Sequence, residues 1–229
     1  MVAWFQELMT SYGSLLWQGI LDTLYMTVVS TLISCILGYP IGILAVVTSP
    51  NGIHPMPVVN KITGAVVNLG RSIPFIILLI AIKPFTQWIA GTSIGPTAVI
   101  VPLVVSATPF MARLVENSFN DLDHGVIEAA RAMGASDMQI IRKVMLPEAM
   151  PSLILGISLG SITIVGCTAM AGTVGGGGLG DIAIRYGYYR NMTDIAVVTV
   201  VLLVIIVQIL QSLGQFASNK IDKRKKGER

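Results

Sequence analysis

Long stretches without a charged side chain are the feature that most constrains the fold of this chain. Asp, Glu, Lys and Arg are all absent from residues 23–60, 84–112, 149–180 and 195–219. A bilayer core about 30 Å thick needs roughly 20 apolar residues in helical conformation. Because 53% of the residues are hydrophobic and only 12% are charged, the sequence indicates a membrane protein.

The apolar runs and the turn signals between them predict five membrane spans. They lie at about residues 20–47, 62–83, 96–114, 150–173 and 194–216. Pro50 and Pro55 mark a loop after the first span, and the turn-rich "GTSIGP" separates the second span from the third. The predicted fold class is an all-α polytopic membrane protein with five transmembrane helices, in which residues 1–229 form a single transmembrane domain.

The distribution of Lys and Arg predicts the orientation of the chain. The tail at 217–229 contains six basic residues, and basic residues are enriched in cytoplasmic segments. The C-terminus is therefore expected in the cytoplasm and, with an odd number of spans, the N-terminus outside. Eleven of the fifteen basic residues then lie inside. The N-terminus lacks the basic region of a cleaved signal peptide, so we expect it to be retained.

A polar segment at about 120–148 stands out from the apolar runs and is predicted to be cytoplasmic. It contains "EAARAMGASDMQIIRKVMLP", from Glu128 to Pro147. Asp123 is placed to cap a short helix, and Gly134 stands where a C-terminal cap favours positive φ. The segment begins, on this pattern, with a helix and a glycine turn.

A second helix is predicted directly after the glycine turn. Ser136 and Gln139 have the spacing of a capping box, and an apolar stripe follows them. We expect Pro147 to end this helix, because proline disfavours helical conformation at the preceding residue. An amphipathic connector resting on the membrane surface would also fit this pattern.

The spacing within this segment resembles the EAA signature of ABC-importer permeases. The matching positions are Glu128, Ala129, Ala130, Gly134, Leu146 and Pro147, with Val144 where the family has isoleucine. The resemblance implies a type I ABC-importer permease fold, with a coupling helix that sits in a groove of a separate cytoplasmic ATPase. Small alanines would allow close approach to that partner, and Glu128 offers a charge to its basic groups.

The same resemblance implies the partners of the chain. Two ATPase subunits would bind ATP and Mg, a second copy of this chain would complete the pathway, and an extracytoplasmic binding protein would deliver the substrate. The chain itself would then be a transport subunit of a bacterial cytoplasmic membrane and not an enzyme. It would hold no cofactor and no metal, and we expect no nucleic acid partner.

Three further stretches are similar to the permease subunit of methionine importers. They are "RSIPFIILLI" (71–80), "ATPFMARLVENS" (107–118) and "TAMAGTVGGGGLGDIAIRYGYY" (168–189). The resemblance implies inward transport of L- or D-methionine or a related amino acid. A permease of the same family with another small substrate is the alternative. A secondary transporter often carries an internal repeat, and we find none.

Four residues are candidates for the translocation pathway or its gate: Arg71, Ser72, Pro74 and Met170. Arg71 stands out because insertion of Arg at the centre of a membrane helix costs about 2.5–3.5 kcal/mol. It either lines the pathway or forms an ion pair, with Glu116 as a possible partner. We expect Pro74 to kink the helix, and Met170 either to contribute to a gate or to pack in the core.

Two glycine patterns superficially suggest catalysis or nucleotide binding. Gly156-Ile157-Ser158-Leu159-Gly160 has the letters of a serine nucleophile elbow but lies in an apolar helix, where the same spacing favours close helix packing. An intramembrane hydrolase using Ser158 is the remaining alternative.

The glycines at 175–180 match a dinucleotide fingerprint without the preceding strand, and no Walker lysine is present. They are expected to break the helix, as a hinge or a close-packed loop. Cys35 and Cys167 fall within spans and indicate no disulfide.

Overall fold

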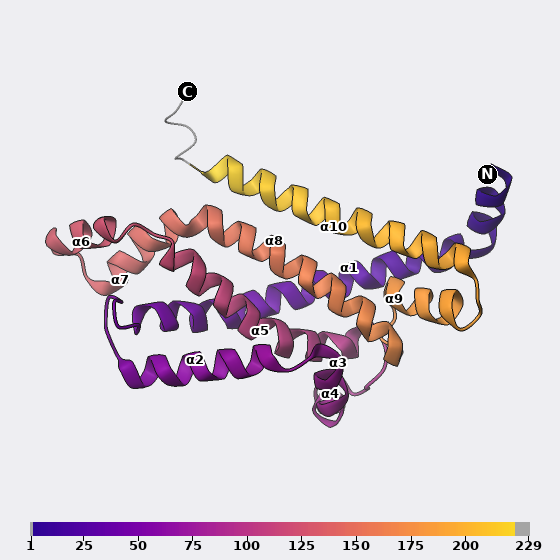
Figure 1. Ribbon diagram of the computed structural model, residues 1–229, viewed down its shortest axis with the longest axis horizontal. Helices are drawn as coiled ribbons and strands as arrows, with labels where there is room; N and C mark the ends of the chain where they lie inside the picture. Colours follow the sequence, from indigo (N-terminus) through magenta and orange to yellow (C-terminus); the bar gives the residue numbers. More distant parts are fainter. Residues whose placement is uncertain (1, 223–229) are drawn as a thin grey trace. The chain divides into compact units, whose positions relative to one another are not determined.

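The computed structural model describes residues 2–222, and all regular structure in that range is helical (Figure 1). In chain order the elements are α1 (Val2–Val47), α2 (Pro57–Ser72), α3 (Phe75–Ala81), α4 (Lys83–Ala90), α5 (Pro96–Asn120), α6 (His124–Ala132), α7 (Asp137–Gln139), the π-helix η1 (Ile140–Met145), α8 (Leu146–Ala171), the 3-10 helix η2 (Gly172–Val174), α9 (Gly178–Ile182), the π-helix η3 (Ala183–Tyr188) and α10 (Thr193–Ile221). The predicted all-α membrane fold is confirmed. The predicted cytoplasmic tail lies largely outside the described residues.

Among residues 2–222, four helical segments are long and apolar enough to cross a membrane, Thr10–Val47, Pro96–Asn120, Asp137–Val174 and Thr193–Ile221, and the bent pair α2 and α3 makes five if it is counted as one span. The second predicted span is not one straight helix. α2 and α3 are bent by 96° at their break, where Ile73 is extended and Pro74 precedes α3. Proline lacks an N–H donor and disfavours helical conformation at the residue before it, which explains a break where we expected a kink.

Part of the connection between the second and third spans is helical. α4 starts at Lys83, with Pro84 in its first turn, and ends at Ala90, and Gly91 caps it in a left-handed conformation with φ 72°. Proline is favoured in the first turn of a helix and glycine after the last. The turn signal at Gly91 was therefore recognised, but the short helix before it was not predicted.

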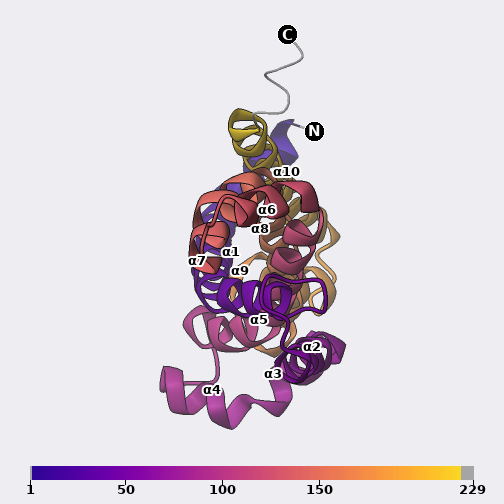
Figure 2. The same ribbon diagram turned by 90° about the vertical axis from the view of Figure 1, so that its left-hand side faces the viewer.

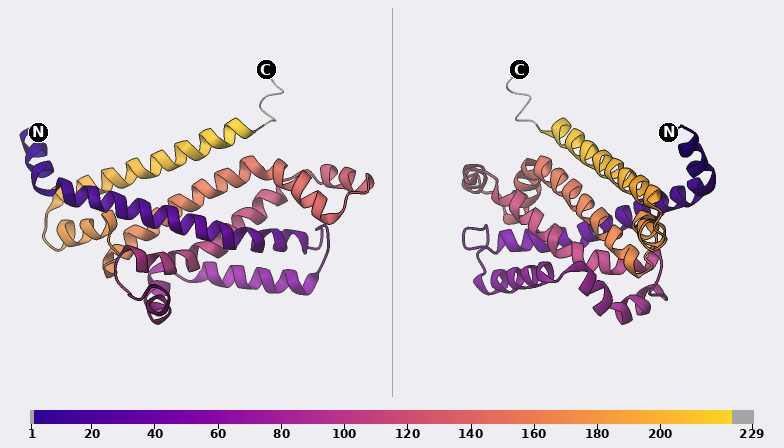
Figure 3. Two further views of the ribbon diagram at one scale, coloured as in Figure 1. Left: turned by 180° about the vertical axis from the view of Figure 1, so that it is seen from behind. Right: turned by 45° about the vertical axis from the view of Figure 1, so that its right-hand side comes forward.

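The chain divides into two compact units. The first comprises Met1–Leu32, Pro74–Val104 and Ser161–Ile209, and the second comprises Ile33–Ile73, Val105–Gly160 and Leu210–Arg229. In the second unit α2 runs beside the C-terminal part of α1 (Figures 1 and 3), and the Asn60 side chain donates a hydrogen bond to the Ala45 oxygen at 2.7 Å.

The core of the first unit joins α1, α9, η3 and α10. Leu16, Ile182 and Ile195 are buried together, and the rings of Tyr12 and Tyr186 meet edge to face with centroids 5.9 Å apart. These contacts bury Ile182 at the end of α9.

The glycine-rich stretch breaks the helix, as predicted, and forms a close-packed turn between η2 and α9. The Leu179 N–H donates to the Thr23 hydroxyl at 2.9 Å. Gly178 has φ 77°, and a Cβ there would lie 2.7 Å from the same hydroxyl oxygen. Only glycine fits both this backbone conformation and this close approach to α1.

Candidate functional site

The polar segment forms the helix, turn and helix expected from its caps. The Asp123 side chain accepts a hydrogen bond from the Gly125 N–H at 2.8 Å and caps α6. Gly134 has φ 81°, and its N–H donates to the Arg131 oxygen at 2.9 Å. These two caps confirm the local prediction for the first helix.

The second helix also begins as predicted, but it does not end at Pro147. The Ser136 N–H donates to the Gln139 side chain at 2.9 Å, as in a capping box. The helix then widens into η1, where the Leu146 N–H donates to the Ile141 oxygen, and continues into α8. The prediction that Pro147 ends the helix was wrong. A π-helix lengthens the turn before proline, so that the missing N–H is accommodated.

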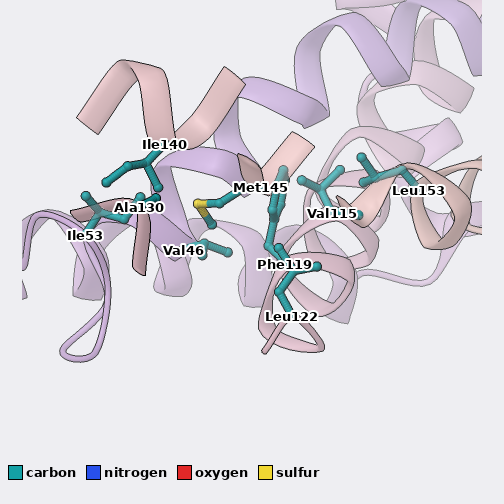
Figure 4. Close-up of a cluster of buried hydrophobic side chains, with 10 residues drawn as sticks. Val46, Ile53, Val115, Phe119, Leu122, Ala130, Ile140, Met145 and Leu153 are labelled. Carbon is teal, nitrogen blue, oxygen red and sulfur yellow. The ribbon is translucent and has the colours of Figure 1, made fainter. Parts of the chain in front are cut away.

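One face of the segment is anchored in the core of the second unit. Ala130, Ile140 and Met145 are buried with residues of α1, α5 and α8, and Val144 and Leu146 pack against this cluster. Figure 4 shows Ala130 beside Ile53 and Ile140. Ala130 therefore packs within the chain, whereas the sequence had suggested that its small side chain allows close approach to a partner.

The other face of the segment is exposed. Glu128, Ala129, Gly134 and Pro147 are all solvent-accessible. In Figure 2, α6 and α7 face the viewer. Of the two alanines in the signature, Ala129 alone is left on this open face for a partner.

The loop after α1 holds the segment in place. The Arg131 guanidinium donates a hydrogen bond to the Ile53 oxygen at 2.7 Å. His54 Nδ1 lies 3.6 Å from an Asp137 carboxylate oxygen, with both side chains more than half exposed. We did not identify Arg131 from the sequence, where its only signal was a basic residue in the last turn of a short helix.

A pocket of about 430 Å³ opens between this loop, the end of α5 and α6. Its lining includes Asn51, His124, Glu128 and Arg131. Within residues 2–222 the Glu128 carboxylate has no hydrogen bond or ion pair. This carboxylate is therefore open to a cationic group from another molecule.

Three of the four pathway candidates lie at the break between α2 and α3, and the fourth lies near the end of α8. Arg71 and Ser72 end α2, and both are exposed, the Ser72 hydroxyl donating to the Asn68 oxygen at 2.7 Å. Pro74 occupies the break before α3. Met170, near the end of α8, is 53% exposed and is not part of a packed core.

Glu116 forms its ion pair with Arg113, at 2.8 Å. Arg113 also donates to the Asn68 side chain at 2.7 Å, which joins α5 to α2. The pair between Arg71 and Glu116 that the sequence had left open is not formed in the described structure. The positive charge of Arg71 is thus left to water or to another molecule.

Ser158 serves helix packing. Its hydroxyl donates to the Leu210 oxygen at 3.0 Å, and its side chain fills the space beside Gly214 of α10. His54 lies in the loop after α1 and His124 starts α6, away from the middle of α8 that carries Ser158. This arrangement supports packing and gives no support to a serine hydrolase.

Long apolar helices, a broken span and a capped polar segment anchored on one face define a polytopic α-helical membrane protein of the transporter class. The chain belongs to the family described as "Binding-protein-dependent transport system inner membrane component", whose profile matches residues 38–227.

Matches to relatives cover most of the chain. It is 47% identical over 203 residues to the probable D-methionine transport system permease protein MetI of Vibrio cholerae, covering 89% of this chain and 90% of that protein. It is 46% identical over 209 residues to the methionine import system permease protein MetP of Bacillus subtilis, covering 91% and 94% of the two chains.

Solved structures agree with these relatives. A chain of the MetNI methionine ABC transporter, in an inward-facing conformation, matches with a TM-score of 0.91 and 46% identity over 93% of this chain and 99% of that chain. An amino acid ABC transporter crystallised with histidines matches with a TM-score of 0.77 and 17% identity, covering 93% and 96% of the chains, and shows the shared fold.

Proposed function

We propose that this chain is the membrane-spanning subunit of an ATP-driven importer that moves methionine, or a closely related amino acid, into the cell. The observation that carries the proposal is the match to a chain of the MetNI methionine ABC transporter over nearly its whole length, at 46% identity. The relatives from Vibrio cholerae and Bacillus subtilis have comparable identity, and their names describe methionine permeases. These names support the same substrate here.

The partner chains are part of this proposal. A separate ATPase, in two copies, would bind ATP and Mg and contact the exposed face of α6, where Glu128 and Ala129 lie. Two copies of this chain would form the pathway, because five helices enclose little space alone. A binding protein outside the membrane would deliver the solute, in keeping with the name of the family.

The packing of the second unit suggests how a movement of the ATPase would reach the membrane helices. Ala130 and Met145 are buried in one cluster with Val46 of α1, Val115 of α5 and Leu153 of α8. Closely packed interiors transmit displacement because they have little free volume. A push on α6 would therefore move three spans together, and alternating access would follow from that motion.

The proposed orientation places α6 in the cytoplasm and the N-terminus outside. It is supported by the excess of Lys and Arg on the side of the polar segment and of the tail. In this orientation Arg71 lies along the pathway, where water or an anionic group of the solute would meet its charge. Ser72 and Pro74 shape the same bend, and Met170 would lie near the outer end of α8 as part of a gate.

Purification in mild detergent, followed by mass spectrometry of co-purifying proteins and small molecules, tests this function. An ATPase at equal stoichiometry and ATP-dependent uptake of labelled methionine into vesicles are the expected results. Uptake of a different solute would refute methionine and leave the importer in place. Recovery of the chain alone, from membranes in which other complexes survive, would refute the importer itself.

A further inference from the structure

A small pocket of about 200 Å³ lies in the first unit, beside α3, α4 and the start of α5. Apolar side chains, among them Leu79, Ile94, Val99 and Pro102, form most of its wall. Drug-sized ligands generally occupy pockets of about 300–1,000 Å³. This pocket therefore suits one end of a longer molecule, whose remainder lies outside it.

Thr86 gives the pocket an unsatisfied polar group. The residue is only 4% exposed, it lines the pocket, and its hydroxyl has no hydrogen-bond partner among the described residues. Buried polar groups are normally hydrogen-bonded, because leaving them unpaired is costly. An acceptor atom that enters the pocket would supply the missing partner.

Lys83 gives the pocket a positive charge. It starts α4, is exposed and lines the pocket together with Thr86 and Ser93. No hydrogen bond or ion pair of its ammonium group occurs within residues 2–222, and no acidic residue is among those that line the pocket. The polar end of the pocket is therefore suited to an anion.

The exposed face of α4 indicates where this pocket lies. Phe85, Trp88 and Ile89 are 45%, 80% and 52% exposed, and the two aromatic rings have centroids 6.1 Å apart. Aromatic side chains of this kind gather at the boundary between the bilayer and water. Because α4 directly follows the broken span, its exposed face and the pocket beside it are expected at that boundary.

From these observations we infer that the pocket binds a phospholipid with an anionic headgroup. The Lys83 ammonium and the Thr86 hydroxyl donate hydrogen bonds to the phosphate, and Ser93 offers a third donor. The apolar wall takes the first part of an acyl chain, whose remainder lies in the bilayer. The lipid would fix α4, and with it the bend at Pro74, at the membrane surface.

A phospholipid fits these features better than a protein partner does. The pocket pairs an apolar wall with a cation at the membrane boundary, which is the arrangement of a lipid headgroup above its acyl chain. A headgroup without an amine, as in phosphatidylglycerol, is favoured because the ammonium of phosphatidylethanolamine would be repelled by Lys83. This inference does not depend on the identity of the transported solute.

Native mass spectrometry of the full chain, purified with whatever subunits accompany it, tests the inference. Phosphatidylglycerol and phosphatidylethanolamine are added in turn, and the retained lipid is counted. Lys83→Ala should lower retention of phosphatidylglycerol about fivefold, the factor that corresponds to about 1 kcal/mol for one basic residue at an anionic surface. Thr86→Val, which keeps the shape and removes the hydroxyl, should lower it about threefold.

Lys61→Ala is the matched control, because Lys61 is an exposed lysine on α2 and does not line the pocket. It should leave retention of phosphatidylglycerol unchanged. Equal retention by the wild type and by both pocket variants would overturn the inference. So would equal retention of the two lipids, or density for a protein side chain in the pocket of the assembled transporter.

Discussion

The Arg131 guanidinium donates a hydrogen bond to the Ile53 oxygen at 2.7 Å and ties α6 to the loop after α1. Arg131→Ala removes this tie and should destabilise the loop by about 1 kcal/mol, since a hydrogen bond from a partly exposed charged group contributes little more. Amide hydrogen exchange of residues 49–56 measures the effect, and we expect faster exchange there.

Arg142→Ala provides the control for this prediction. Arg142 is an exposed arginine of η1 that forms no hydrogen bond or ion pair in the described chain. Its removal should leave exchange in the loop unchanged. Equal exchange in wild type and Arg131→Ala would show that the loop is held by its apolar contacts alone.

Alanine substitutions at Gly134 and Gly64 test whether positive φ alone, without steric overlap, makes glycine necessary at Gly134. A Cβ at either position would meet nothing within 4 Å, but Gly134 has φ 81° and Gly64 lies inside α2. Gly134→Ala should destabilise the turn by about 1–2 kcal/mol. Gly64→Ala should stabilise the chain by about 0.4–1 kcal/mol through the unfolded state.

Thermal unfolding in detergent compares the two alanine variants. Gly134→Asn should cost less than Gly134→Ala, because asparagine tolerates left-handed backbone more readily. If Gly134→Ala left the unfolding midpoint unchanged or raised it, the turn at Gly134 would not depend on positive φ.

The sequence was sufficient to predict the long apolar helices and the caps at Asp123, Gly134 and Ser136 in the polar segment. A helix that crosses a bilayer must satisfy its own backbone, so composition and length determine it locally. Caps depend on residues within a few positions, as with Asp123 and Gly134. The broken span was indicated only in part, because Pro74 predicts a disturbance and does not predict its size.

Contacts between distant positions could not be predicted in this way. Arg113 and Asn68 are separated by 45 positions, and no local pattern connects them. α4 has only eight residues, too few for its amphipathic pattern to be recognised. The continuation of η1 into α8 was missed because the rule for proline assumes a regular α-helical turn, which the π-helix avoids.

Arg113 should be the arginine that stabilises the second unit. Its ion pair with Glu116 is at 2.8 Å, and the two side chains are 26% and 21% exposed. Arg113→Met leaves a partly buried carboxylate unpaired and should destabilise the chain by about 1–3 kcal/mol. Adding Glu116→Gln should recover part of this loss, as measured by the unfolding midpoint.

Arg71→Met tests whether Arg71, unlike Arg113, contributes little to stability. Because Arg71 is exposed and Glu116 already has a partner, its removal should change stability by less than about 0.5 kcal/mol. If Arg71 lies along the pathway, the same variant should lower uptake. A loss of stability as large as that of Arg113→Met would contradict this division of roles.

Glu128→Lys tests the proposed contact with the ATPase. Reversing an exposed, unpaired charge should leave folding intact. In the proposed interface, the new lysine would lie beside a basic group of the ATPase and repel it. We expect ATP-dependent uptake to fall about tenfold or more. Uptake by reconstituted vesicles and thermal unfolding of the same sample separate coupling from folding.

Glu128→Gln should reduce uptake less than Glu128→Lys, because it removes the attraction and adds no repulsion. Normal uptake by the lysine variant would show that this carboxylate does not face a basic partner. Reduced uptake accompanied by unfolding would instead mean that Glu128 has a structural role.

Gly214 and Ser158 define the contact between α10 and α8. A Cβ added to Gly214 would overlap the Ser158 side chain, so Gly214→Val should destabilise the second unit by about 1–3 kcal/mol. Gly166→Val is the control, because a Cβ at that helical glycine of α8 meets nothing within 4 Å. The unfolding midpoint of the control should remain near that of the wild type.

A second substitution tests whether the side chain at position 214 overlaps that of Ser158. Ser158→Gly removes the side chain that the new valine would meet, at the loss of one hydrogen bond to the Leu210 oxygen. Such bonds between membrane helices contribute only about 0.6 kcal/mol on average. The double variant Ser158→Gly with Gly214→Val should therefore be more stable than Gly214→Val alone. A double variant less stable than either single variant would place the overlap at another neighbour of Gly214.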